Sequence, residues 1–197
     1  MTPEPATADG GRPLRADARR NRARLLAAAE AVFTAKGTSA STEEVAREAG
    51  VGIGTVFRHF PTKEALLEAV YVARLERFAE DTRLLSLGRQ PGEALFAFFS
   101  RAVEQSAAKN ALADALAEAG IDVRTASEGV GRKIQDQVGA LLAAAQQAGA
   151  VRGDLDLPAL LALLVGASHA AHYAGDDPDV RRRTLAVVLD GLRAQVS

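Results

Sequence analysis

The stretch from Val51 to Glu64 reads VGIGTVFRHFPTKE, and it decides how the chain around it folds. A short helical pattern at about residues 42–49 precedes it. Gly50 and Gly52 interrupt that pattern before a second short helix at about residues 54–60. Two short helices joined by a tight, glycine-containing turn form a helix-turn-helix, the arrangement that places one helix in the major groove of DNA. The sequence therefore predicts a DNA-reading unit here.

Start and stop signals mark the ends of these helices. Ser41 and Glu44 have the spacing of a capping box, in which the hydroxyl caps the helix and the carboxylate reaches back to the cap. Pro61 stops the second short helix, and Thr62 caps the long helix that follows it. Upstream, apolar residues at helical spacing predict a further helix at about residues 17–36.

The apolar residues of this region also predict its packing. Those of the two short helices and the turn are expected to pack against the inward stripe of the preceding helix, which leaves four side chains pointing outward. The inward set is Val45, Ala46, Val51, Val56 and Phe60 against Leu25, Ala29 and Phe33, and the outward set is Ile53, Thr55, Arg58 and His59.

Alanine, leucine, glutamate and arginine dominate the whole chain and favour helix throughout, so an all-α fold is predicted. Beyond Gly88 the helices are expected at about residues 92–109, 111–119, 124–148, 157–174 and 178–195. The expected domains are a disordered arm at residues 1–15, a three-helix DNA-binding domain at 16–63 and a helical domain at 64–197.

Charge is unevenly distributed. From Arg12 to Lys63 there are ten Lys and Arg against five Asp and Glu, and from Glu64 to Ser197 there are fourteen against eighteen. The basic part is the one expected to meet a polyanion.

Absence of cysteine excludes disulfides and thiolate metal sites. No apolar run reaches the ~20 residues of a membrane span, so a cytoplasmic protein without a membrane partner is expected.

The quoted stretch closely resembles the DNA-binding signature of TetR-family transcription regulators. The likeness covers about residues 19–70, where the glycines, the aromatic residues, the Lys-Glu pair and all their spacings agree. It implies a homodimer with two recognition helices in successive major grooves of a palindromic operator. It also implies that the C-terminal helical domain binds a ligand and dimerises, although that region identifies no particular ligand.

Carried over by position, the resemblance implies individual roles. The residues at phosphate-contacting positions are Thr42, Thr55, His59 and Lys63, and those within reach of base edges are Glu43, Gly52, Ile53 and Arg58. Phe57 stands where the family usually has a tyrosine. Because it lacks the hydroxyl, it is expected to pack or to contact a thymine methyl instead.

Plainer alternatives stay open for several of these residues. His59 could simply end a helix, Arg58 could be a solvated charge, and Ile53 could belong to the core. Glu43 would repel phosphate and could do no more than favour its helix N-terminus. The N-terminal arginines could be a solvated tail or an arm that touches DNA, and they are Arg12, Arg15, Arg19 and Arg20.

Two strongly apolar helices near the C-terminus predict a dimer interface. A helix that is apolar on two sides is buried on two sides, so one side is expected to meet a second copy in a four-helix bundle. The predicted interface residues are Leu157, Leu161, Leu164, Ser168, His172, Leu185, Val188, Leu189, Leu192 and Val196.

Bulky apolar residues on the preceding helices predict a ligand pocket. Its expected border is Phe78, Phe96, Phe99, Val103, Leu116, Val138 and Leu142. His169 and His172 share a helix face, but no further ligands at suitable spacing accompany them, so core or interface histidines are expected rather than a metal site.

The predicted function is a ligand-responsive repressor, with operator DNA, a second copy and a small-molecule effector as its partners and no cofactor. The main alternative is a DNA-binding protein of the same fold that is controlled by protein partners without a small molecule. A ligand-sized cavity or a filled core would distinguish the two. An all-helical enzyme is disfavoured because the sequence shows no nucleophile–base pair, metal set or phosphate loop.

Overall fold

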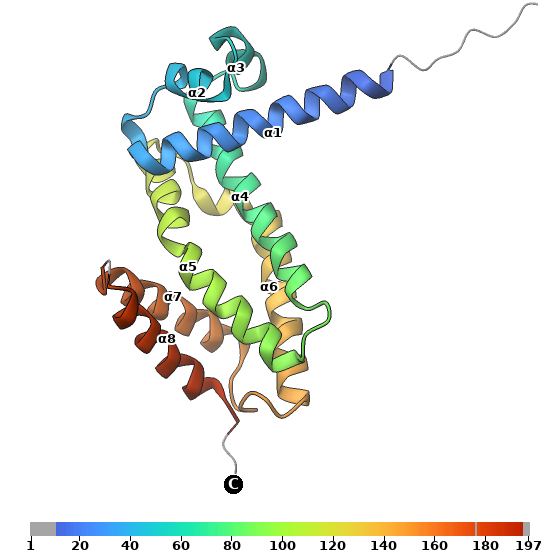
Figure 1. Ribbon diagram of the computed structural model, residues 1–197, viewed down its shortest axis with the longest axis vertical. Helices are drawn as coiled ribbons and strands as arrows, with labels where there is room; N and C mark the ends of the chain where they lie inside the picture. Colours follow the sequence, from blue (N-terminus) through green and yellow to red (C-terminus); the bar gives the residue numbers. More distant parts are fainter. Residues whose placement is uncertain (1–10, 176, 195–197) are drawn as a thin grey trace, which may run out of the picture. The chain divides into compact units, whose positions relative to one another are not determined.

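The computed structural model describes residues 11–175 and 177–194, and these residues are almost entirely helical (Figure 1). The all-α prediction is confirmed. The elements are α1 (Gly11–Lys36), the 3-10 turn η1 (Gly37–Ser39), α2 (Thr42–Ala49), α3 (Ile53–His59), α4 (Lys63–Leu85), α5 (Pro91–Glu118), α6 (Val123–Gln147), α7 (Leu157–Tyr173) and α8 (Pro178–Leu192). Within the described ranges, no helix combines the length and apolarity that a membrane crossing requires.

Contacts divide the chain into two compact units. The first unit ends at Val70 and the second begins at Tyr71, so the division falls inside α4. In the first unit α1 packs against α2, and α2 packs against α3. The predicted inward set is buried there, apart from the half-buried Val51.

Helix α1 begins earlier than expected. It starts at Gly11 rather than at residue 17, so residues 11–15 of the predicted disordered arm are helical. Leu14, Arg15 and Ala16 are good helix formers, and Pro13 is tolerated in a first helical turn, where backbone N–H groups lack helical partners anyway. The rest of the predicted arm lies outside the described residues.

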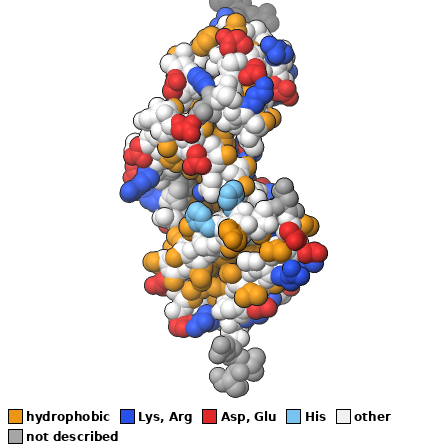
Figure 2. Space-filling view, turned by 90° about the vertical axis from the view of Figure 1, so that its left-hand side faces the viewer, with side chains coloured by type: hydrophobic (Ala, Val, Ile, Leu, Met, Phe, Trp, Pro, Cys, Tyr) orange, Lys and Arg blue, Asp and Glu red, His pale blue; other side chains and the backbone are white. Residues whose placement is uncertain are grey.

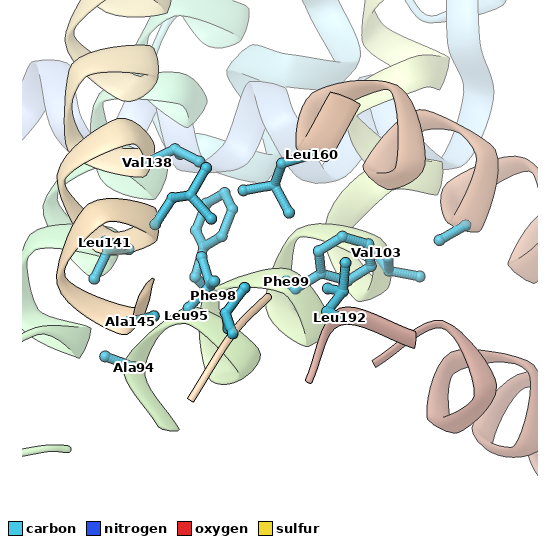
Figure 3. Packing of buried hydrophobic residues seen from close by; sticks show 13 residues of the cluster. Ala94, Leu95, Phe98, Phe99, Val103, Val138, Leu141, Ala145, Leu160 and Leu192 are labelled. Carbon is cyan, nitrogen blue, oxygen red and sulfur yellow. The ribbon is translucent and has the colours of Figure 1, made fainter. Parts of the chain in front are cut away.

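The second unit has its core between α5, α6 and α7 (Figure 3). Phe98 and Phe99 of α5 are fully buried, and Leu160 of α7 and Leu192 of α8 belong to the same cluster. Helix α5 packs against α6 and α7, and α7 packs against α8. Gly92 permits one close approach in this unit, because a Cβ there would lie 2.5 Å from the Cβ of Ala150.

Two helix boundaries of the second unit differ from the predicted ones. Helix α5 runs unbroken through residue 110, where a break was expected. Asparagine lowers helix stability only moderately, and the alanines and leucines around Asn110 strongly favour helix. Helix α8 ends at Leu192 rather than at residue 195. Beyond it, the segment pairs with the loop after α6: Arg152 N–H donates to Leu192 C=O (3.0 Å) and Ala194 N–H donates to Ala150 C=O (3.3 Å).

Candidate functional site

The turn between α2 and α3 has the backbone geometry that the glycines predicted. Gly50 ends α2 with φ of +66°, in the left-handed region that favours glycine. Its N–H donates to Arg47 C=O (3.1 Å), and the N–H of Val51 donates to Ala46 C=O (3.0 Å). Backbone groups at the end of α2 are thereby paired, and the chain turns directly into α3.

Side chains of α1 contact the end of α2, just before this turn, and the end of α3. The guanidinium carbon of Arg22 lies 5.3 Å from the centre of the Phe60 ring, a cation–π distance. Arg24 donates from Nη2 to Ala49 C=O at 3.4 Å. The sequence showed these arginines only as part of a basic run, because contacts over more than twenty residues are not visible in local spacing.

Helix α3 exposes an apolar surface. Ile53 and Phe57 are 36% and 44% exposed, and among the described residues of the first unit they are the large hydrophobic side chains that remain exposed. Arg58 is exposed next to Phe57, whereas Thr55 and His59 are half-buried. The core interpretation of Ile53 and the packed interpretation of Phe57 therefore do not fit the structure.

Residues at the edges of α3 differ in accessibility. Thr42, expected at a phosphate, is only 8% exposed, and its hydroxyl lies 3.4 Å from a Glu43 carboxylate oxygen. Little of its surface is left for a phosphate. Lys63 is half-buried at the start of α4, whose first turn is capped by Thr62 Oγ1, which accepts from Ala65 N–H at 3.1 Å.

Gly54 is a candidate that the sequence reasoning treated only as the first residue of the second short helix. It lies inside α3, it is exposed, its φ is not positive, and a Cβ built on it would meet no atom within 4 Å. Neither backbone conformation nor packing within the chain requires glycine there. The missing side chain leaves room for another molecule to approach the helix backbone closely.

A cavity of about 250 Å³ lies in the second unit, between α4, α5 and α7. Its wall is partly apolar and partly cationic. The lining residues are Arg74, Leu75, Phe78, Ala102, Gln105, Ser106, Lys109, Asn110, Leu164, Val165, Ser168 and His169.

Most of the predicted pocket border lies elsewhere. Phe78 lines this cavity, while Phe96, Phe99, Leu116, Val138 and Leu142 do not. Four of those five are buried in cores, and half-buried Phe96 packs against the core under the guanidinium of Arg193, 4.7 Å away. Val103 borders a separate hollow between α5, α7 and α8. Bulky side chains on these helices fill the interior instead of bordering the cavity.

Most of the predicted dimer residues lie against the core of their own chain. Leu192 is 1% exposed and belongs to the core, and Val196 lies outside the described residues. His172 is exposed, and the other predicted side chains are half-buried. Except for Ser168, these half-buried side chains pack against the core of their own chain. The large hydrophobic residues that α7 and α8 do expose are Leu163, Val165, Tyr173 and Val187.

Hydrophobic side chains also gather on one face of the second unit. Figure 2 shows hydrophobic side chains gathered on the second unit in the lower half of the view, with histidine side chains at the edge of the patch. For Leu163 the sequence signal was a second apolar stripe on α7, beside the stripe chosen for the interface, whereas no predicted stripe included Val165, Tyr173 or Val187. Among the residues that the structure describes, no group of three or more potential ligands is placed to hold a metal ion.

The first unit thus has the geometry of a helix-turn-helix DNA-binding domain. Residues 25–70 match the model of the tetR family of bacterial regulatory proteins, and residues 90–194 match the model of the C-terminal domain of SbtR-like transcriptional regulators. The chain belongs to the TetR family of transcription regulators.

Solved structures of whole regulators agree with this assignment. A TetR regulatory protein from Mycobacterium vanbaalenii shares 45% identity, with 92% of this chain and 99% of that chain covered and a TM-score of 0.79. A TetR regulator from Streptomyces coelicolor shares 38%, with 89% and 99% covered and a TM-score of 0.73. A third structure, which concerns control of antibiotic production by bacterial hormones, shares 25%, with 89% and 98% covered and a TM-score of 0.65.

Proposed function

We propose that the protein is a dimeric repressor that reads a palindromic operator with α3 and releases it when a small molecule binds in the second unit. The observation that carries the DNA-reading part is the exposed surface of α3. Ile53 and Phe57 are exposed on a short helix that α1 and the Gly50 turn hold in place. Large apolar side chains are costly to leave in water, and thymine methyl groups in the major groove are suitable partners for them.

Polar contacts supply the rest of the proposed interface. Arg58 is exposed on α3, where a guanidinium can pair with the two acceptors of a guanine. Thr55, His59 and Lys63 are proposed phosphate contacts, which fix the position of the helix but carry no sequence information. The absence of side chains at Gly52 and Gly54 lets the start of α3 approach the DNA closely.

Exposed apolar side chains on α7 and α8 support dimerisation through these two helices. Leu163 and Val187 are 41% and 73% exposed on neighbouring helices. Two copies that pair these helices form a four-helix bundle and remove the surface from water. A two-fold dimer presents its recognition helices to half-sites about 35 Å apart, one turn of DNA.

Control by a small molecule is favoured over control by a protein partner alone, because a cavity lies between α4, α5 and α7 beside the filled core of the second unit. The cavity volume of about 250 Å³ is just below the range of about 300–1,000 Å³ for pockets of drug-sized ligands, so the ligand is expected to be small. The similar structure that concerns bacterial hormones supports a small-molecule signal. A ligand that binds one conformation of the dimer better shifts the population toward it and lowers operator affinity.

The purified protein, incubated with fragmented genomic DNA, is expected to select fragments with two inverted half-sites one helical turn apart. A small-molecule extract of the native cells should release the protein from those fragments. Selection of fragments without any common motif would contradict operator reading. Selection of a motif with no release by the extract would contradict ligand control only.

A further inference from the structure

Helix α8 has an inner and an outer face. The side chains that lie in or against the core of the second unit are Leu185, Val188, Leu189 and Leu192. On the outer face Arg183, Val187 and Asp190 are exposed, and their spacing of four and three residues sets them in one row along the helix. This row, the outer stripe, has a positive charge at one end, a negative charge at the other and an apolar residue between them.

Helix α7 adds little charge to the same surface. It packs beside α8, and its sequence contains two histidines but no aspartate, glutamate, lysine or arginine. At neutral pH the charges of this helix pair therefore come almost entirely from α8. A second copy that covers the two helices must be oriented so that it is compatible with those charges.

Both ends of the outer stripe can take a further ionic partner. The guanidinium of Arg182, rather than that of Arg183, pairs with Asp179 at 2.8 Å. Asp190 Oδ1 accepts from Arg193 Nε at 3.3 Å, a contact between exposed side chains that contributes little in water. A carboxylate has two oxygens and can accept from two guanidinium groups, so Asp190 can keep this contact and also pair with an arginine of a second copy.

Two-fold symmetry makes the outer stripe complementary to itself in the antiparallel orientation. When two α8 helices cross antiparallel at Ala186 and Val187, residues at equal distances on either side of the crossing face each other. Arg183 then meets the partner's Asp190, and Asp190 meets the partner's Arg183. In a parallel pair each of these residues would meet its own counterpart, and like charges would repel.

We infer that Arg183 and Asp190 fix the orientation of the dimer and its choice of partner, through two symmetric ion pairs between antiparallel α8 helices. This inference rests on the proposed dimerisation and names the residues that align the two copies. Charges across an interface select a partner more than they strengthen binding, because like charges brought together are costly. A chain of the same fold with other charges at these two positions is rejected as a partner.

Charge reversal in the full-length protein tests the pairing. Arg183→Glu and Asp190→Arg each bring like charges together at two places in a homodimer. Each variant should therefore raise the dimer dissociation constant about tenfold or more in sedimentation equilibrium. The double variant exchanges the two charges and should dimerise like the native protein.

Mixing the two single variants gives the sharpest measurement. Unlike charges then face each other at both positions, so an equimolar mixture should form a heterodimer, a gain that loss of folding cannot produce. Arg181→Glu is the matched control. Arg181 is an exposed arginine of the same helix, but it borders the hollow between α5, α7 and α8 instead of belonging to the outer stripe, so this variant should dimerise normally.

Native dimerisation by both single variants, or a mixture of them that stays monomeric, would overturn the pairing of Arg183 with Asp190 while the native protein remains a dimer. Loss of dimerisation in the double variant would also overturn it. A native protein that is monomeric at micromolar concentration would contradict the proposed dimer itself.

Discussion

Ser41 and Glu44 cap α2 reciprocally: the Ser41 hydroxyl accepts the Glu44 N–H at 3.2 Å, and the Glu44 carboxylate accepts the Ser41 N–H at 3.0 Å. The other oxygen of the same carboxylate pairs with the ammonium of Lys36 at the end of α1. One side chain therefore starts α2 and ties it to α1. Since α2 supports α3, the cap also fixes the position of the proposed reading helix.

Stability of the first unit should depend on the charge of Glu44. The Lys36 ammonium and the Ser41 N–H lower the pKa of this carboxyl, with the hydrogen bond to Lys36 the larger cause. Its contribution is fully present above the unfolded-state pKa of about 4.3 and is lost as pH falls through the lower folded-state value. Glu44→Gln keeps a cap acceptor but not the charge. We expect the free energy of unfolding, measured with urea, to fall less in this variant than in the native protein as the pH is lowered from 7 to 3.

A matched control for this measurement is Glu48→Gln, which removes an exposed carboxylate from the same helix outside the capping box. It should retain the native loss of stability on acidification. Ser41→Ala removes the cap itself and should cost about 1 kcal/mol at pH 7. If Glu44→Gln kept the full native pH dependence, the carboxylate would not be the titrating group of this cap.

Gly54→Ala should weaken DNA binding without lowering the stability of the fold. A Cβ at this position meets no atom of the protein within 4 Å, and alanine is the better helix former by up to about 1 kcal/mol. The melting temperature should stay the same or rise. Operator affinity should fall by about tenfold or more, because the methyl group holds the backbone of α3 away from the DNA.

The control for Gly54→Ala is Gly129→Ala, in which the glycine is also exposed, helical and surrounded by open space, but lies on α6 in the second unit. This variant should gain similar stability and bind operator normally. Normal operator binding by Gly54→Ala would show that the DNA does not approach α3 at this residue.

The first unit could be predicted closely from the sequence because its signals are local. A capping box, a left-handed glycine and a proline that follows a short helix each specify backbone conformation within a few residues. The structure places the cap of α2 at Ser41 and the turn at Gly50, as expected. The cation–π contact between Arg22 and Phe60 could not be predicted in this way, because it joins residues far apart in the chain.

In the second unit, apolar periodicity predicted the helices but not which apolar side chains face inward. Helix α7 has two apolar stripes, and nothing in their spacing tells which of them the chain buries by itself. The structure buries neither stripe as a whole: within one of them, Leu160 lies in the core and Leu163 is exposed. In the same way, Phe99 was expected beside a ligand and is part of the core, whereas the cavity is bordered by charged residues such as Lys109.

The dimer interface can be tested at an exposed residue without damaging the fold. Val187 is 73% exposed on α8, so a charge there is solvated in the monomer but buried in the proposed bundle. Val187→Glu should give folded monomers in light scattering, with operator affinity reduced because the two half-sites are no longer bound together. Leu87→Glu is the control, since Leu87 is 59% exposed between α4 and α5, away from α7 and α8. A dimer of normal stability in Val187→Glu would place the interface elsewhere.

Arg58 should contribute to base reading, and Lys63 to phosphate binding. Arg58 is exposed on α3, while Lys63 is half-buried at the start of α4. Lys63→Ala should weaken binding to operator and random DNA alike, and reduce the salt dependence by about one counterion per subunit. Arg58→Ala should cost about 1–3 kcal/mol per half-site on operator and much less on random DNA, because a contact to base edges carries the discrimination. Titration of both variants against both DNAs at several salt concentrations measures these differences. Equal losses on the two DNAs for Arg58→Ala would make Arg58 a phosphate contact and leave sequence reading to Ile53 and Phe57, the apolar residues that α3 exposes.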